Sequence, residues 1–226
     1  MSNTAELHTD FFVPVVVDTA AMAWQSSPGS GVWRKRLELL GGTESGRVTS
    51  IVRYDAGSRF PSHGHPDGEE ILVLDGVFAD EHGSYPAGTW LLNPEGFEHS
   101  PRSDEGCVLL VKLRQYPGAD RGHRVVASRS AAWDQSETPG REVLTLYDEP
   151  DHPEKIRLVR FAPGTRAPEH DHPGGEEIFV LSGTIADGDG VYPEGTWVRF
   201  PDGSRHQPWS DEGCALYVKV GHLRGL

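Results

Sequence analysis

The sequence predicts an all-β fold built from two tandem domains. One pattern of residues occurs twice at a fixed spacing, and the correspondence runs without a gap from about residue 50 to 113 of the first copy. Within each copy, short segments rich in β-branched and aromatic residues are separated by Gly, Pro and Asp clusters. Helical periodicity of useful length is absent. Many short strands joined by regular turns are typical of closed or sandwiched β architectures.

The expected strands begin with a short apolar segment in each copy, around Val16 and Val17 in the first and around Val125 and Val126 in the second. The following strands of the first copy are expected at residues 48–54, 71–74, 89–93 and 107–113. A turn-rich stretch at residues 116–123 separates the copies. The predicted domains are therefore 1–118 and 119–226.

Some of these strands are apolar on both faces. In residues 71–74 and 107–111, the odd-numbered side chains are expected to face the barrel interior. The even-numbered side chains, on the outer face, are apolar too. The other domain or a second subunit is expected to cover the outer face, so a homo-oligomer such as a dimer is predicted. The copies differ on this face, with Leu72 and Leu110 corresponding to Phe179 and Tyr217.

Each copy contains four candidate metal ligands. They are His63, His65, Glu69 and His99 in the first copy and His170, His172, Glu176 and His206 in the second, each 107 positions later (63 to 170). Two histidines at i and i+2 on a strand project from the same face, and the turn at residues 66–68 lets the glutamate enter from the next strand. Three imidazoles and one carboxylate suit a divalent transition ion such as Zn, Fe, Ni, Mn or Cu, rather than Ca or Mg.

The alternative reading of these histidines is a structural one, because a single His-x-His pair is common on half-buried strands. The chain has 11 His, and the six in the pattern are the ones that have a His counterpart in the other copy. This repetition favours metal ligands. The remaining five are expected on the surface: His8, His82, His123, His152 and His222.

The spacing of glycines and candidate ligands resembles the paired motifs of the cupin superfamily. The matching residues are Gly57-x5-His63-x-His65-x3-Glu69-x6-Gly76 and Gly88-x5-Pro94-x-Gly96-x2-His99, with residues 164–183 and 195–206 as the second set. The resemblance covers nearly the whole chain and implies a bicupin, with two jelly-roll (double-stranded β-helix) barrels and a metal in each barrel mouth. One departure is Ser103 and Ser210, where the general motif ends in Asn at a position that is not a ligand.

A finer similarity concerns the cupin domain of ChrR-type anti-sigma factors, and it lies in residues 68–76, 85–90, 99–101, 104–107 and 111–113. This resemblance implies zinc, a role in sensing oxidative stress, and an extracytoplasmic-function sigma factor as partner. In that family a separate N-terminal helical domain holds the sigma factor. Nothing in this sequence resembles those helices or their His-x3-Cys-x2-Cys zinc ligands.

Two functional classes remain open. In the first, a four-ligand tetrahedral Zn site belongs to a sensing or regulatory module without turnover, and Zn is the favoured ion. In the second, the same ligands on Fe, Mn or Ni leave positions for a small organic substrate and oxygen, as in cupin dioxygenases of the acetylacetone-cleaving type. The list of ligands does not separate a sensor from an enzyme.

Composition excludes several partners. Lys and Arg total 21 against 34 Asp and Glu, so the net charge of −13 repels nucleic acid and anionic membrane surfaces. The apolar run at residues 11–17 is too short to span a membrane and lacks the flanks of a signal peptide, so a soluble cytoplasmic protein is predicted. Cys107 and Cys214 occupy equivalent positions and are expected to be reduced, buried thiols, in preference to redox-sensing ones.

Other residues shared by the copies are given structural roles. Glu70 with Lys112, and Glu177 with Lys219, are expected to form ion pairs on the outer face. The aromatic pairs Tyr85 with Tyr192 and Trp90 with Trp197 are expected in the cores. The copies differ near the candidate ligands, at Phe60 against Ala167, Asn93 against Phe200, Phe97 against Ser204 and Arg102 against Trp209. We therefore expect two similar metal sites with different pockets.

Overall fold

The structure, a computed structural model, describes residues 6–118 and 120–225. In these two ranges every regular element is a β-strand, and all strand pairings are antiparallel, which confirms the predicted all-β fold. The chain forms two compact units. The first contains Met22–Ala131 with Met1–Thr9, and the second contains Ala132–Leu226 with Asp10–Ala21.

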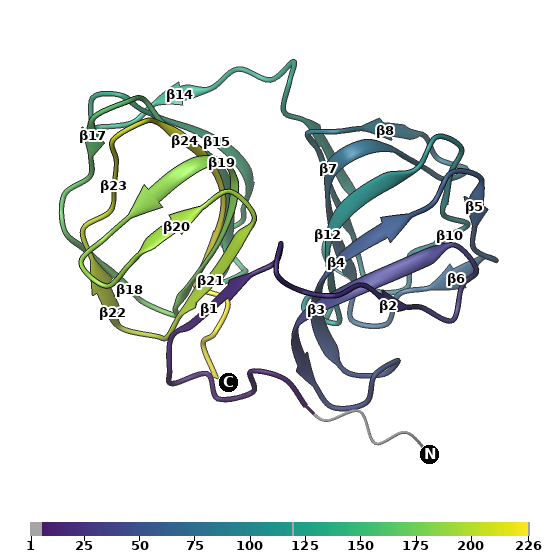
Figure 1. Ribbon diagram of the computed structural model, residues 1–226. Helices are drawn as coiled ribbons and strands as arrows, with labels where there is room; N and C mark the ends of the chain where they lie inside the picture. The colour runs from purple at the N-terminus through teal and green to yellow at the C-terminus, as the bar shows by residue number, and fades with distance from the viewer. Residues whose placement is uncertain (1–5, 119, 226) are drawn as a thin grey trace. The chain divides into compact units, whose positions relative to one another are not determined.

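The first unit is a curved stack of strands whose largest sheet has the order β13-β9-β7-β12-β4-β3-β2 (Figure 1). Strands β5, β8 and β11 join this sheet through β7, and β6 pairs with β10 in a small separate sheet. The strands are β2 (Gln25–Ser26), β3 (Val32–Leu40), β4 (Arg47–Tyr54), β5 (Ser58–Arg59), β6 (His63–Gly64), β7 (Glu69–Ala79), β8 (Ser84–Pro86), β9 (Thr89–Asn93), β10 (Glu98–His99), β11 (Arg102–Ser103), β12 (Cys107–Leu113) and β13 (Arg124–Ala127).

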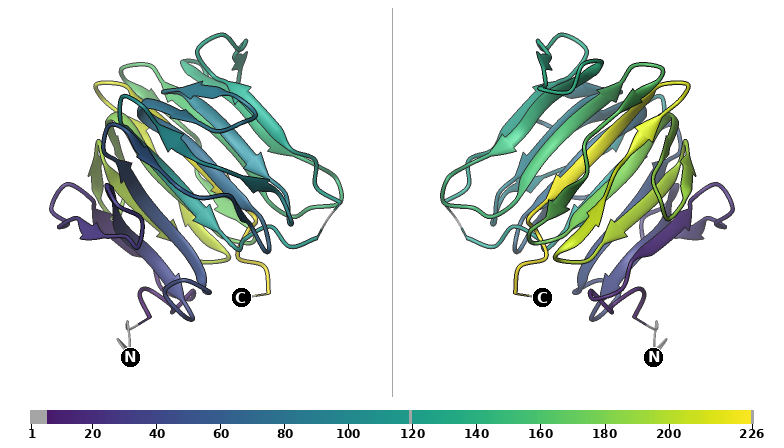
Figure 2. Two further views of the ribbon diagram at one scale, coloured as in Figure 1. Left: turned by 90° about the vertical axis from the view of Figure 1, so that its right-hand side faces the viewer. Right: turned by 90° about the vertical axis from the view of Figure 1, so that its left-hand side faces the viewer.

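The second unit repeats this arrangement, with the order β1-β21-β19-β24-β16-β15-β14 and a small sheet of β18 and β22. Figure 2 shows the strands of each unit running alongside one another in curved sheets. Its strands are β1 (Val15–Asp18), β14 (Asp134–Gln135), β15 (Arg141–Asp148), β16 (Lys155–Phe161), β17 (Thr165–Arg166), β18 (His170–His172), β19 (Glu176–Ala186), β20 (Val191–Pro193), β21 (Thr196–Phe200), β22 (Ser204–His206), β23 (Trp209–Ser210) and β24 (Cys214–Val220).

The strand that opens each copy of the repeat completes the sheet of the other unit. Strand β1 pairs with β21, with Val17 opposite Trp197, and β13 pairs with β9, with Val126 opposite Trp90. The compact units therefore differ from the predicted domains 1–118 and 119–226 in these two segments. The reason is that strand pairing follows backbone hydrogen bonding and apolar burial in three dimensions, not the order of the repeat.

The longest strand of each unit bends, so that its two halves pair with different strands. The first half of β7 pairs with β9, and its end pairs with β8 and β11. Gly76 marks the bend, at a φ of 70° and beside a register shift against β12. A Cβ atom at this position would lie 2.1 Å from the carbonyl oxygen of Gly106, so only glycine fits. Gly183 in β19 has the same surroundings, with the carbonyl oxygen of Gly213 at 2.1 Å.

The interior of the first unit confirms the predicted alternation along the strands. The odd-numbered residues Ile71, Val73, Leu109 and Val111 belong to one buried cluster. The equivalent residues of the second unit form the corresponding cluster. The residues on the opposite face are buried as well, and include the even-numbered Leu72 and Leu110 of the first unit and their counterparts Phe179 and Tyr217 of the second. A homo-oligomer stays a prediction.

The shared tryptophans lie in the cores, as predicted. Trp90 and Trp197 are fully buried, and each indole Nε1 donates a hydrogen bond of 2.7 Å to a glutamate, Glu70 and Glu177 respectively. Lys112 lies opposite Glu70 in the β7–β12 ladder, and both side chains are buried. Glu70 also accepts a short hydrogen bond from the Tyr116 hydroxyl. The ion pair between Lys112 and Glu70 stays a prediction.

Both cysteines are free, buried thiols, as predicted. Burial raises the pKa of Cys107 to about 11 and raises the pKa of Cys214 as well. Because the thiolate is the reactive form, neither side chain is expected to react at pH 8 in the folded protein. An aromatic disulfide reagent should label no thiol in native buffer and both thiols in denaturant, as followed by absorbance. Rapid labelling of the native protein would contradict this prediction.

Candidate metal centres

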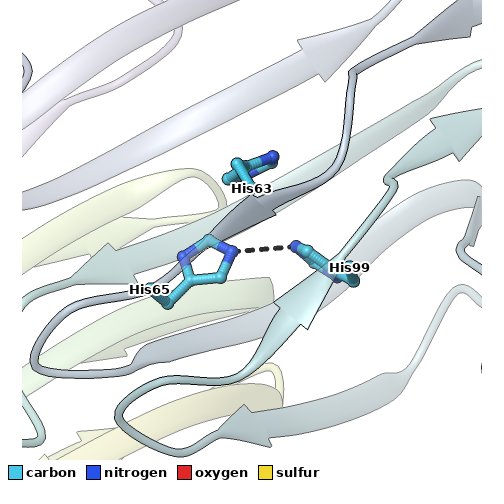
Figure 3. Close-up of side chains that lie close together, drawn as sticks. All are labelled: His63, His65 and His99. Atoms are coloured by element: carbon cyan, nitrogen blue, oxygen red, sulfur yellow. Dashed lines mark hydrogen bonds between the residues drawn. The ribbon is translucent and has the colours of Figure 1, made fainter.

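Three imidazoles of the first unit converge on one point (Figure 3). His63 and His99 face each other in the β6–β10 pairing, and His65 follows two residues after His63. The candidate ligand atoms of these three histidines all lie within 4.8 Å of one another, and the Nε2 atoms of His65 and His99 are 2.9 Å apart. The predicted i and i+2 arrangement therefore places two imidazoles of one segment beside a third.

Glu69 closes this cluster from the start of β7. Its Oε2 atom lies 3.4 Å from His65 Nε2 and 3.5 Å from His99 Nε2. Asn93, which lies opposite Glu69 in the β7–β9 ladder, donates a hydrogen bond of 2.9 Å to the same carboxylate oxygen. The turn before Glu69 contains Asp67 and Gly68, both with positive φ, as the sequence predicted for the approach of this side chain.

The second unit repeats the cluster. His170 lies opposite His206 in the β18–β22 pairing, and the candidate ligand atoms of His170, His172 and His206 lie within 4.8 Å of one another. Glu176 Oε2 is 3.3 Å from His172 Nε2 and 3.4 Å from His206 Nε2. The structure thus brings together all four predicted ligands in each unit, although their binding of an ion stays a prediction.

The donor atoms of the second cluster fit a transition ion. His172 Nε2, Glu176 Oε2 and His206 Nε2 are buried and have no hydrogen-bond partner among the described residues. Buried polar atoms without partners are costly, since each has lost its water. One cation among them would satisfy all three atoms, and two imidazoles with a carboxylate are donors that Zn, Fe, Mn and Ni accept.

In each cluster, one imidazole contacts an aspartate through the ring nitrogen that faces away from the cluster, and the sequence analysis did not single out this aspartate. His99 Nδ1 lies 3.2 Å from Asp80 Oδ2, and His206 Nδ1 lies 2.9 Å from Asp187 Oδ2. This contact keeps the proton on Nδ1 and directs the Nε2 lone pair toward the cluster. The signal was available, because Asp80 and Asp187 are also separated by 107 positions. Tyr85, predicted as core, is buried and also donates a hydrogen bond of 3.1 Å to Asp80.

Burial shapes the ionisation of the second cluster. Burial, together with the neighbouring His206 and His170, lowers the pKa of His172 to about 3, which keeps this imidazole neutral. Burial raises the pKa of Glu176 to about 7. Burial acts in the opposite direction on His206, yet the hydrogen bond to Asp187 and the nearby Glu176 raise its pKa. The neutral His172 imidazole is therefore in the form that binds a metal, whereas Glu176 and His206 would release protons when an ion binds.

A pocket opens beside each cluster, and the two pockets differ as predicted. Phe60 and Tyr54 line the pocket of the first unit together with His63, His65, Glu69 and His99. The pocket of the second unit contains Ala167 in place of Phe60, and it is lined by more charged side chains. His63 is exposed and His170 is partly exposed, so a small molecule can reach both clusters.

The remaining histidines follow the surface prediction in part. His82 and His123 are exposed, and His123 stacks on Phe97 at a centroid distance of 4.8 Å. The prediction is wrong for His222, whose side chain is only 4% exposed and whose Nε2 lies 3.5 Å from Glu177 Oε2. The carboxylate that this imidazole approaches belongs to a distant strand, which local sequence does not reveal.

No helix of the described residues is long and apolar enough to cross a membrane.

Comparison with known proteins identifies the relatives of this fold. A model of the ChrR cupin-like domain matches residues 13–117 and again residues 121–224. No curated protein matches the sequence.

Three solved structures illustrate the likeness in fold. A candidate dioxygenase from Nostoc punctiforme is 17% identical, with a TM-score of 0.75 over 92% of this chain and 82% of that one. A candidate glyoxylate-induced protein from Pseudomonas aeruginosa is 12% identical, with a TM-score of 0.75 over 98% and 93%. A variant of oxalate decarboxylase from Bacillus subtilis is 15% identical, with a TM-score of 0.62 over 91% and 76%.

Proposed function

Because this chain belongs to the ChrR cupin-like domain family, with one copy of the domain in each half, we propose that it is a metal-dependent sensing or regulatory module. The observation that carries the proposal is the pair of His3Glu clusters, each beside a pocket and each held by an aspartate. An ion in each cluster, with Zn favoured and Fe, Ni or Mn as alternatives, would supply an electrophilic centre that holds a ligand at the pocket.

The metal centre, not the cysteines, is the sensing element in this proposal. The Cys107 and Cys214 thiols are buried and their pKa values are raised, so they are poorly placed to react with an oxidant. The histidine clusters instead contain exposed or partly exposed imidazoles at the pockets. A role in the cytoplasmic response to oxidative stress, and an extracytoplasmic-function sigma factor as partner, are parts of the proposal that rest on the family alone.

A second candidate function is a metal-dependent dioxygenase of the acetylacetone-cleaving type. The observation that favours it is the open pocket beside each cluster, where a small organic molecule would lie next to the metal. The fold likeness to the candidate dioxygenase from Nostoc punctiforme is compatible with this alternative. In an enzyme, the chain's own residues would orient the substrate against the His and Glu side chains and exclude water from the pocket.

One experiment tests the sensing proposal against the enzyme. The protein is loaded with Fe(II), which hydrogen peroxide oxidises to Fe(III) as the peroxide is reduced, and the release of the ion on treatment with peroxide is followed by a chromogenic chelator. Peroxide should release the ion equally from the native sequence and from a Cys107→Ser, Cys214→Ser double variant. The Fe(II) form should consume no oxygen with acetylacetone. Loss of the response in the thiol variant would refute sensing by the metal centre, and steady oxygen consumption would support the dioxygenase.

A further inference from the structure

The pocket of the second unit contains two arginines that face the histidine cluster. Arg141 and Arg157 line the same pocket as His170, His172 and Glu176. We propose that this pocket binds a small carboxylate, held between the two guanidinium groups beside the metal centre. The inference extends the proposed function, since it assigns a ligand class to one of its two sites. The first unit is not expected to bind this ligand in the same way.

The two arginines lie on the inner face of neighbouring strands. In the β15–β16 ladder, Arg157 lies opposite Thr145 and Arg141 lies opposite Phe161, with the pair Val143 and Val159 between them. Residues two positions apart on a strand share a face, so all six residues point to the same side of the ladder. The pocket lining confirms this side as the interior, because Arg141, Val143, Thr145, Arg157 and Val159 all contribute to it.

Neither guanidinium has a strong partner of its own. The guanidinium group of Arg141 forms no hydrogen bond or salt bridge within residues 6–118 and 120–225, and the aromatic ring of Phe161 lies 5.9 Å from it. Arg157 has a buried Nε atom without a hydrogen-bond partner, and its Nη2 atom is 3.8 Å from Asp148. Asp148 is itself engaged more closely by Lys155, at 3.0 Å. Both arginines therefore retain donors that a ligand can use.

The two positive charges are close enough to oppose each other. Burial and then the charge of Arg157 lower the pKa of Arg141, while Glu176 acts in the opposite direction. A bound anion would relieve this repulsion and satisfy the free donors of both side chains. Guanidinium groups present a planar set of donors that matches a carboxylate with two parallel hydrogen bonds. Arrangement and charge thus point to one ligand chemistry.

The first unit lacks this arrangement. In the strand registers, Val32 takes the place of Arg141 and Ser50 takes the place of Arg157. The arginines on this face of the first unit are Arg34 and Arg36, which both lie near Glu44, at 3.8 and 3.7 Å. The first pocket also contains Phe60, where Ala167 leaves more room in the second. Because Arg34 and Arg36 already share the charge of Glu44 and the pocket beside them is narrowed by Phe60, the first unit favours an added anion less than the second. This difference explains why two clusters with the same metal-binding side chains need not bind the same small molecule.

The test measures binding of acetate and benzoate to the zinc-loaded full chain by calorimetry. Binding of inorganic phosphate is measured in the same way, as the alternative anion. Arg157→Ser, which copies the first unit, is expected to weaken carboxylate binding by about tenfold or more, and Arg157→Lys should restore only part of it. Arg34→Gln is the matched control and should bind as the native sequence does. Equal binding by Arg157→Ser, loss of binding in Arg34→Gln, or a preference for phosphate would overturn the inference.

Metal content separates this inference from the proposed function. Zinc is measured in every variant, because none of the substituted arginines is a candidate ligand. If the native chain holds its ions but binds no carboxylate, the anion pocket is refuted while the metal-based proposal stands. If carboxylate binds and the chain holds no ion, the metal-based proposal fails and the anion pocket stands.

Discussion

Replacing His206 with alanine is expected to lower the zinc content of the reconstituted protein from two ions per chain to one. His206 supplies one of the three imidazoles of the second cluster, and its removal leaves His170, His172 and the buried Glu176 carboxylate. Two imidazoles and one carboxylate hold a divalent ion far less tightly than the complete set. Elemental analysis after exhaustive dialysis measures the change.

The control for this prediction is the mirror substitution in the other unit. His99→Ala should also remove one ion, and the double variant His99→Ala, His206→Ala should hold none. His82→Ala, which removes an exposed histidine outside both clusters, should retain two ions. Two ions in the His206→Ala protein would show that the second cluster is not a metal site.

Replacing Trp90 with alanine is expected to destabilise the protein by about 3–5 kcal/mol, because the substitution leaves a large cavity in the first unit. Trp90 is fully buried, and it lies between Leu72 of β7 and Val126 of β13 in the sheet. The substitution also removes the Nε1 hydrogen bond to Glu70. Urea unfolding, followed by circular dichroism, measures the loss in the free energy of unfolding.

A second substitution separates packing from hydrogen bonding. Trp90→Phe retains most of the apolar volume but removes the Nε1 donor. It should lower the free energy of unfolding by less than the alanine variant does, by about 1–3 kcal/mol, because a buried carboxylate loses its hydrogen-bond partner. Trp197→Phe is the matched change in the second unit, where the same bond reaches Glu177. If the free energy of unfolding of Trp90→Ala lies within about 1 kcal/mol of the native value, the role assigned to this residue is wrong.

The sequence predicted the strands and the composition of the candidate site because both depend on local patterns. The expected strands at 89–93 and 107–113 match β9 and β12 in full, since apolar alternation and flanking turns mark their ends. The convergence of His170 and His172 follows from the geometry of a single strand, β18, and His63 and His65 have the same i and i+2 spacing at the end of β6. The duplication added a second test of each residue, because a chance histidine is not expected to recur at the same register.

Other contacts depend on residues that are far apart in the chain, and local patterns do not encode them. The aspartate that contacts each cluster was missed because Asp80 follows the end of β7 and reaches His99 only after this strand has bent at Gly76. His222 was assigned to the surface because its approach to Glu177 joins the end of the chain to β19. Such contacts are set by packing across strands, which the order of residues along one strand does not specify.

The sequence by itself determined that this protein has two β-rich halves and two sets of three histidines and one glutamate, because duplication and alternation are properties of the chain itself. Only the tertiary structure decided which strand completes which sheet, which aspartate supports each imidazole, and that Arg141 and Arg157 face one pocket. The physical reason is that the pairing of strands and the burial of charge are settled when distant segments pack together.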